Sequence, residues 1–175
     1  MTKALGVQAL LGLSPVVALQ PMYNLLKRQA ESEILPMARS ERLAVFPYSP
    51  LAGGLLSGKC GPGKRPQGGG VGDNARYGTR YGAAANFDIA GRFTQLAAEA
   101  GRHPVALAVA WVAGHPAVTA PLLGARDVEQ LRPALTALDE PLDDDLRARI
   151  SALSPEPPPA TDRNEERSAH NYGRR

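Results

Sequence analysis

The sequence predicts an α/β fold built around a parallel sheet. Three short apolar runs, each typical of a strand buried on both faces, occur at 16–20, 43–49 and 117–124. Segments with helical spacing of apolar residues separate them, and such alternation favours parallel strands joined by right-handed crossovers. Three buried strands cannot cover themselves or close a barrel. The pattern therefore also predicts a missing piece, or a partner that supplies it.

The first half of the chain alternates between helix and strand. Residues 3–13 have apolar residues near helical spacing, and Ser14-Pro15 ends the predicted helix before the first strand. Residues 30–41 predict an amphipathic helix with glutamate early and arginine late, as the helix dipole favours. After the second strand, residues 51–58 predict a loop of small residues.

The second half begins with a glycine-rich stretch. Segment 61–86 contains eight glycines and little core-forming potential, so we expect a long surface loop. Asp127 and Gln130 have the spacing of a capping box at a helix start. Helices are expected at 88–101, 104–115, 127–138 and 143–153. The chain therefore divides into a body, 1–153, and a polar, proline-rich tail, 154–175.

Composition excludes several classes of function. The net charge is only +3 and basic residues alternate with acidic ones, which argues against a nucleic-acid partner. No apolar run reaches the length of about 18 residues that a membrane span needs. The N-terminal apolar stretch is interrupted by Gln8, Gly12 and Pro15 and lacks a cleavage site of small residues. We therefore expect a cytoplasmic protein.

Polar or aromatic residues follow each predicted strand, where ligand sites of α/β folds lie. Gln20 ends the first strand, and its amide suits a carboxamide ligand, although an amide in this place more often satisfies buried backbone. Tyr48 ends the second strand and offers a flat face for stacking on a planar ring, or for packing at the sheet rim.

Two further segments have the chemistry of phosphate sites. The small residues from Ser49 to Gly54 place backbone N–H groups close together, as a diphosphate cradle requires, although most such turns are plain loops. Gly124 and Arg126 precede a helix N-terminus, where a guanidinium can bind a phosphate such as the 2′-phosphate of NADP. Arg126 could instead be a surface charge, and Gln130 a helix cap only.

The remaining reactive side chains predict neither a metal site nor a catalytic residue. The three histidines, His103, His115 and His170, have no neighbours at ligand spacing. Cys60 is the only cysteine, so it cannot form an intramolecular disulfide, and no base accompanies it in its loop. Trp111 lies in the most apolar helix and is expected in the core.

Several segments together resemble the aldo-keto reductase family, in the bacterial branch similar to aryl-alcohol dehydrogenases. PYSPLAGGLLSGK (47–59) and GARDVEQL (124–131) are specific in combination, and the match continues over 19–39, 105–112 and 142–153. The resemblance implies an NADP-dependent oxidoreductase that reduces aldehydes or ketones to alcohols by hydride transfer. It also implies a partial TIM (β/α)₈ barrel, approximately strands 6–8 with their helices, as the C-terminal half of a truncated chain.

The resemblance assigns ten residues to NADP(H). The nicotinamide end is implied for Gln20 and Tyr48. The diphosphate loop is implied for Ser49, Pro50, Leu51 and Gly53, with Lys59 nearby. The 2′-phosphate and adenine end is implied for Gly124, Arg126 and Gln130. The family often has an asparagine near the adenine where this chain has Ala134.

The resemblance also implies an absence. The family's catalytic Asp, Tyr, Lys and His lie on earlier strands, whereas this chain matches from within the fifth barrel helix, so we expect it to be inactive alone. The tyrosines Tyr23, Tyr77, Tyr81 and Tyr172 fit no catalytic position. An alternative is a non-catalytic nucleotide-binding or assembly module that pairs with itself, or with a complementing half-barrel, through exposed strand edges.

Overall fold

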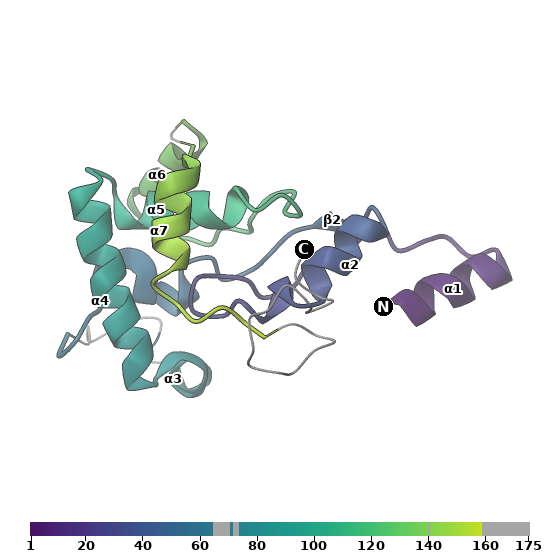
Figure 1. Cartoon of the computed structure of the whole chain (residues 1–175), viewed down its shortest axis with the longest axis horizontal. Helices are drawn as coiled ribbons and strands as arrows, with labels where there is room; N and C mark the ends of the chain where they lie inside the picture. The colour runs from purple at the N-terminus through teal and green to yellow at the C-terminus, as the bar shows by residue number, and fades with distance from the viewer. Residues whose placement is uncertain (65–70, 72–73, 140, 159–175) are drawn as a thin grey trace, which may run out of the picture.

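A computed structural model describes residues 1–64, 71, 74–139 and 141–158. Helices outnumber strands in this part of the chain (Figure 1). In order, the elements are α1 (Thr2–Leu11), β1 (Ala18–Leu19), η1 (Gln29–Glu31), α2 (Ile34–Ser40), β2 (Ala44–Val45), η2 (Ala52–Ser57), α3 (Ala75–Tyr81), α4 (Ala84–Glu99), α5 (Pro104–Ala113), α6 (Val128–Leu135), η3 (Thr136–Leu138) and α7 (Asp144–Ser151).

The sheet is parallel, as predicted, and contains β1 and β2. Ala18 pairs with Ala44 and Leu19 with Val45. An isolated parallel bridge between Met22 and Tyr48 keeps the same register beyond the strands. The two segments that follow β1 and β2 therefore leave the sheet side by side at its carboxyl edge.

The third predicted strand, 117–124, does not form a regular strand. It does lie beside β2, because the Thr119 N–H donates to the Val45 carbonyl at 2.9 Å. The Val45 N–H, however, donates to the Thr119 side-chain oxygen at 3.0 Å rather than to a backbone carbonyl. Pro47 and Pro121 carry no N–H to continue a ladder. The Leu122 N–H still donates to the Pro47 carbonyl at 2.8 Å, so the segment lies along β2 with some backbone hydrogen bonds but without a regular ladder.

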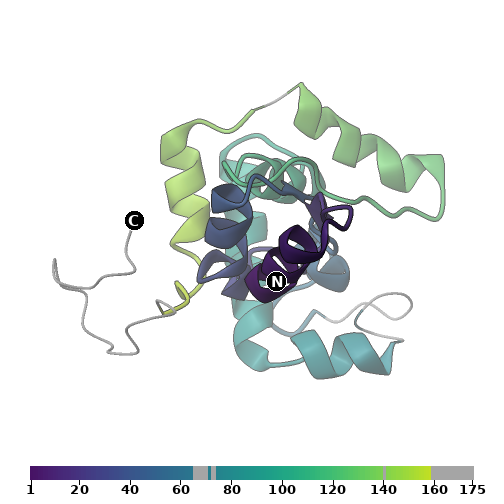
Figure 2. The same ribbon diagram turned by 90° about the vertical axis from the view of Figure 1, so that its right-hand side faces the viewer.

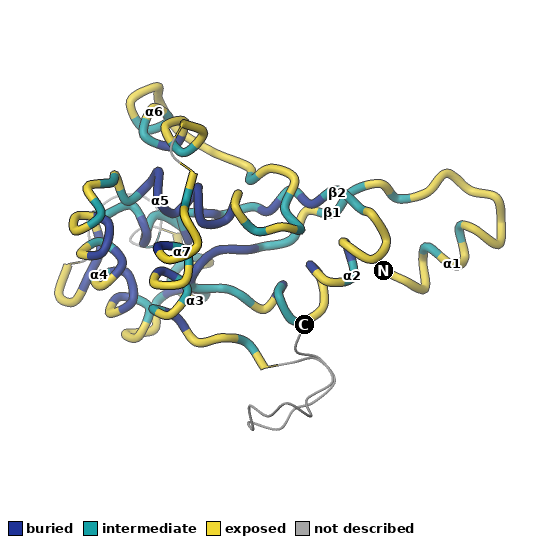
Figure 3. The backbone as a smooth tube through the Cα atoms, turned by 45° about the horizontal axis from the view of Figure 1, so that its top comes forward, coloured by how far each residue is buried: buried dark blue, intermediate teal, exposed yellow. Residues whose placement is uncertain are grey.

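Helix α5 forms the centre of the core. Every residue from Val105 to Val112 is buried, as the apolar density of this segment predicts, and Trp111 is only 1% exposed. The His103 side chain accepts a hydrogen bond from the Val105 N–H and Pro104 occupies the first turn, which together start the helix. Helix α5 packs against α4, α6 and η2. Figure 3 shows buried residues concentrated along α4 and α5.

The predicted surface loop 61–86 is wrong over its last part. Residues Ala75–Tyr81 form α3, and α4 already begins at Ala84. The Asn74 side chain caps α3 by accepting from the Arg76 N–H, which compensates for the low helix propensity of glycine in that helix. Residues 65–70 and 72–73 of the predicted loop lie outside the described part of the chain.

Helix α1 lies apart from the other helices at the right-hand end of Figure 1 and is nearest the viewer in Figure 2. It ends, as predicted, before Ser14-Pro15, with Gly12 in the left-handed conformation at φ 64°. None of its residues is buried, and Leu10 is 84% exposed. Within the described residues, no helix is long and apolar enough to cross a membrane. The cytoplasmic location stays a prediction.

The other predicted helices are present, with shifted ends. The segment 30–41 divides into η1 and α2, and the segment 143–153 contains α7, which Asp143 caps through the Leu146 N–H. Of the predicted tail, residues 154–158 are described; Ser32 donates to the Pro158 carbonyl at 2.9 Å. Residues 159–175 lie outside the described part of the chain.

A buried polar cluster connects the segment after β1 to the core. The Tyr23 hydroxyl donates to Glu31 at 2.7 Å, and Arg28 forms two hydrogen bonds with the same carboxylate. The Tyr23 ring lies 5.2 Å from that of Trp111. Burial, then the Glu31 charge, raises the pKa of Tyr23 well above its usual range. Neutral Tyr23 therefore acts as a donor inside the fold.

Candidate functional site

A cleft of about 1280 Å³ opens at the carboxyl edge of the sheet. It lies between the turn after β2, helix α3 and the segment that leads into α6. Its volume is larger than that of a typical small-molecule pocket and has room for a dinucleotide. Nine of the ten predicted site residues line it: Tyr48, Ser49, Pro50, Leu51, Gly53, Lys59, Gly124, Arg126 and Gln130.

The turn after β2 has an unusual backbone. Ser49 and Ala52 adopt positive φ angles of 60° and 51°, which non-glycine residues rarely do, and Gly53 and Gly54 follow at 65° and 96°. Leu51, at φ −89°, directly precedes this positive run. A change of φ sign between neighbouring residues turns consecutive N–H groups to one side, forming a concavity that suits an anion. Within the turn the Ala52 N–H donates to the Ser49 carbonyl at 3.0 Å and the Gly54 N–H to the Leu51 carbonyl at 2.9 Å, so these two N–H groups already have partners in the turn itself.

A buried asparagine holds this turn through side-chain hydrogen bonds. The Asn24 side-chain nitrogen donates to the Ser49 carbonyl at 2.9 Å and to the Tyr81 hydroxyl at 3.0 Å. Asn24 is 0% exposed and belongs to the segment after β1. The amide therefore joins the segment after β1, the turn after β2 and helix α3.

The opposite wall of the cleft is the start of α6. Asp127 caps this helix by accepting from the Gln130 N–H at 2.8 Å, as the capping-box spacing predicts. The Gln130 side-chain oxygen accepts from the Arg126 N–H at 3.2 Å, rather than from Asp127. Arg126 is exposed and lines the cleft beside the positive end of the helix dipole. A phosphate could meet both charges there.

Apolar residues form another part of the cleft lining. Ala134 is 5% exposed and packs with Val105 and Val109, with Leu51 against them. The position where the family often has an asparagine is therefore an apolar surface here. Cys60 also lines the cleft, but it is only 6% exposed rather than accessible, and burial raises the pKa of its thiol.

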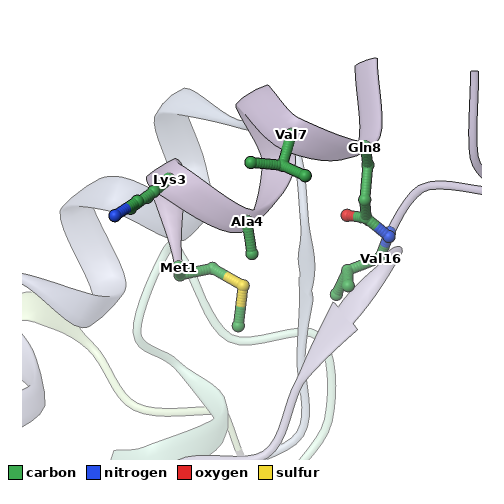
Figure 4. A pocket seen from close by; sticks show the side chains of 6 residues that line it. All are labelled: Met1, Lys3, Ala4, Val7, Gln8 and Val16. Carbon is green, nitrogen blue, oxygen red and sulfur yellow. The ribbon is translucent and has the colours of Figure 1, made fainter. Parts of the chain in front are cut away.

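Gln20 is the predicted site residue that the cleft does not include. It directly follows β1, is exposed and is absent from the cleft lining. A separate hollow lies between α1 and Val16, and none of the ten predicted residues lines it (Figure 4). Its walls are mainly aliphatic, with Lys3 and Gln8 as the polar contributors (Figure 4). Among the described residues no group of three or more His, Cys, Asp and Glu side chains could hold a metal ion.

Sequence reasoning did not identify two of the groups that shape the cleft. Tyr77 lines it from α3, inside the stretch that was expected to be a loop. Asn24 supports it from the segment after β1. The helical spacing of Tyr77 and Tyr81 was available as a signal for the first. Nothing in the spacing of Asn24 indicated that its partner would lie 25 residues later.

Comparison with known proteins agrees with the family resemblance. A family model described as the aldo/keto reductase family matches residues 4–155. An uncharacterized oxidoreductase of Bacillus subtilis, YrpG, is 38% identical over 147 residues, which cover 81% of this chain and 41% of that protein. Protein tas of Escherichia coli is 30% identical over 138 residues, covering 79% and 40%.

The name of a third relative describes a different role. A probable voltage-gated potassium channel subunit beta of Oryza sativa subsp. japonica is 32% identical over 148 residues, which cover 79% of this chain and 43% of that protein. This chain thus spans 40–43% of the length of these curated relatives.

Proposed function

The chain belongs to the aldo/keto reductase family, and we propose that its cleft binds NADP(H) for the reduction of aldehydes or ketones to alcohols. The observation that carries this proposal is the convergence of nine predicted cofactor residues, from two segments some 70 residues apart, on one cleft. The partial (β/α)₈ barrel is part of the same proposal, supported by the parallel register of β1 and β2 and by the third segment beside them.

The two ends of the cleft suit the two charged parts of this cofactor. The positive-φ turn from Ser49 to Gly54 suits the diphosphate. Arg126, beside the N-terminus of α6, suits the 2′-phosphate, which distinguishes NADP from NAD. Lys59 is exposed at the cleft margin and adds positive charge. Glu129 also lines the cleft, but its carboxylate lies 3.5 Å from Arg132, which offsets its charge.

The nicotinamide end has an aromatic residue in place. Tyr48 lines the cleft at the carboxyl end of β2, where its ring can stack on a planar ligand. When bound, NADPH supplies the hydride that reduces the carbonyl carbon. In our proposal the residues that donate the proton to the carbonyl oxygen lie outside this sequence, and Gln20 reaches the nicotinamide only when further strands complete the site.

A second candidate function is an assembly module. The exposed apolar residues of α1 and the free edge of β1 favour it: Val17 is 69% exposed and, in the described part of the chain, the sheet has only two strands. A second copy or a complementing half-barrel would cover both. Sizing chromatography separates the candidates, since a discrete dimer that binds NADPH favours the module and an aggregating chain without binding favours a fragment.

Two assays test the main proposal. Titration of NADPH fluorescence with the purified chain should show saturable binding. The same chain with NADPH and a broad substrate such as 4-nitrobenzaldehyde should show no oxidation of NADPH. Clear turnover would contradict the assignment of proton donation to residues outside the sequence, and absent binding would contradict the cofactor site.

A further inference from the structure

The buried Asn24 side chain has all of its polar atoms in hydrogen bonds. Besides the two bonds donated by its nitrogen, its oxygen accepts from the Leu26 N–H at 3.0 Å. Asn24 itself does not line the cleft. A fully satisfied amide at 0% exposure holds its partners firmly, because breaking any one bond leaves a buried polar group unpaired.

The Ser49 carbonyl that Asn24 holds belongs to a strained residue. Ser49 has φ 60°, a conformation that costs about 1–3 kcal/mol in a non-glycine residue and persists only where the surroundings enforce it. Its carbonyl also accepts from the Ala52 N–H at 3.0 Å, and the preceding Tyr48 N–H donates to the Pro21 carbonyl at 3.0 Å. The bond from Asn24 therefore adds a side-chain support to a backbone that turns sharply into the cleft wall.

Helix α3 meets the same turn at a second point. The Tyr81 hydroxyl accepts from Asn24 and donates to the Met22 sulfur at 3.4 Å, with the side chain fully buried. Tyr77, one turn earlier, stacks on Tyr81 with ring centroids 6.2 Å apart and lies against Gly53. Asn24 thus fixes the turn and the helix that packs on it together.

We propose that Asn24 is a positioning residue for the NADP(H) site. Through the Ser49 carbonyl and the Tyr81 hydroxyl, it holds the turn and α3 in the arrangement that receives the diphosphate and nicotinamide. This inference rests on the proposed function, because it concerns the orientation of that same site. It predicts a local effect, since Arg126 lines the cleft from the start of α6, whereas the Asn24 side chain bonds to Ser49, Tyr81 and Leu26.

The test compares two ligands on two variants of the full chain. NADPH occupies the whole proposed site, whereas adenosine 2′,5′-bisphosphate lacks both the nicotinamide and the diphosphate bridge. Asn24→Ala should raise the Kd for NADPH about ten-fold, and Tyr81→Phe by about three-fold, as the loss of a buried hydrogen bond implies. Neither variant should change the Kd for adenosine 2′,5′-bisphosphate by more than about two-fold, the scatter expected for a site left unaltered.

Asn86→Ala is the matched control. Asn86 is partly buried and does not line the cleft. Its side chain donates to the Tyr81 carbonyl at 3.1 Å. This variant should lower the melting temperature, by less than Asn24→Ala because Asn24 is fully buried and makes three side-chain hydrogen bonds, and should leave the Kd for NADPH unchanged. A role of Asn24 in stability alone would give the two asparagine variants the same binding profile.

The remaining outcomes contradict either the positioning role of Asn24 or the proposed function. An unchanged Kd for NADPH in a folded Asn24→Ala chain, or an equal loss for both ligands, contradicts the positioning role. If Asn24→Ala does not fold, Tyr81→Phe decides, because it keeps the ring and removes only the hydroxyl. If the unaltered chain binds adenosine 2′,5′-bisphosphate but not NADPH, or binds neither, the proposed function itself is wrong and the inference falls with it.

Discussion

The ring of Tyr77 lies directly against the backbone of Gly53. A Cβ atom placed on Gly53 would stand 3.0 Å from Cδ1 of Tyr77, closer than ordinary packing allows. Gly53 also has φ 65°, in the left-handed region. Helix α3 can therefore approach the turn after β2 this closely because residue 53 has no side chain, and the cleft wall depends on that contact.

Gly53→Ala should consequently destabilise the chain by more than backbone strain alone. The left-handed conformation costs an alanine about 1–2 kcal/mol, and the displacement of Tyr77 adds about 1 kcal/mol or more. Urea denaturation measures the sum as a lower free energy of unfolding.

Gly101→Ala is the control for backbone strain. Gly101 has the same φ of 65°, but a Cβ atom there would meet nothing within 4 Å. Equal losses in the two variants would show that the contact between Tyr77 and Gly53 contributes nothing to stability.

Arg126→Ala should weaken NADPH binding and leave NADH binding nearly unchanged. The guanidinium is assigned to the 2′-phosphate, which NADH lacks, and a charge-assisted contact of about 1.5–3 kcal/mol corresponds to a roughly ten-fold or greater rise in Kd. Arg39→Ala is a suitable control, because Arg39 is exposed on α2 and does not line the cleft. If Arg126→Ala weakened the binding of NADPH and NADH equally, the assignment of Arg126 to the 2′-phosphate would be wrong.

Protonation of His115 should lower the free energy of unfolding in acid. Burial, and then the positive charge of Arg147, lower the pKa of His115 below its usual 6.5, against the opposing charge of Glu31. Its Nδ1 accepts from the Ala117 N–H at 3.2 Å, so the folded state favours the neutral ring. Because the unfolded chain takes up this proton first, the contribution is complete above about pH 6.5 and is lost as the pH falls toward the folded-state pKa.

The measurement for His115 is the free energy of unfolding as a function of pH. His115→Asn keeps an acceptor for the Ala117 N–H but does not titrate, so its curve should decline less steeply than that of the unaltered chain between about pH 6.5 and 5. Parallel curves over this interval would contradict the assignment.

Tyr23→Phe should be more costly than Tyr81→Phe. The Tyr23 hydroxyl donates to the Glu31 carboxylate, whereas the Tyr81 hydroxyl has the neutral partners Asn24 and Met22. Hydrogen bonds to charged groups contribute about 1.5–3 kcal/mol and those between neutral groups about 1 kcal/mol. Chemical denaturation of both variants measures the difference, and the reverse order would contradict this account of the cluster.

Local signals predicted those parts of the fold that depend on near neighbours. The spacing of apolar residues identified the buried helix α5, and the Asp127–Gln130 spacing identified the cap of α6. The prediction of a third strand was wrong because the Thr119 side chain accepts the hydrogen bond from the Val45 N–H. This contact joins residues 74 positions apart. Helix α3 was missed because it lies in the glycine-rich segment 61–86, although Asn74 caps it and tertiary packing stabilises it.

The candidate site divides in the same way. Residues that follow strands could be chosen because parallel strands share a carboxyl edge, and nine of the ten choices line one cleft. Gln20 lies outside that lining; it directly follows β1, whose second edge has no partner in the described sheet. Asn24 and Tyr81 could not be paired from sequence, since their contact spans 57 residues and depends on how α3 packs.

The most direct test of the cofactor site is hydrogen–deuterium exchange of the full chain with and without NADPH. The account predicts slower exchange in residues 48–59 and 124–130, the two segments that carry the nine cleft-lining residues assigned to the cofactor, and no change in α1. Protection confined to other segments, or no protection at NADPH concentrations well above those that saturate the fluorescence titration, would contradict it.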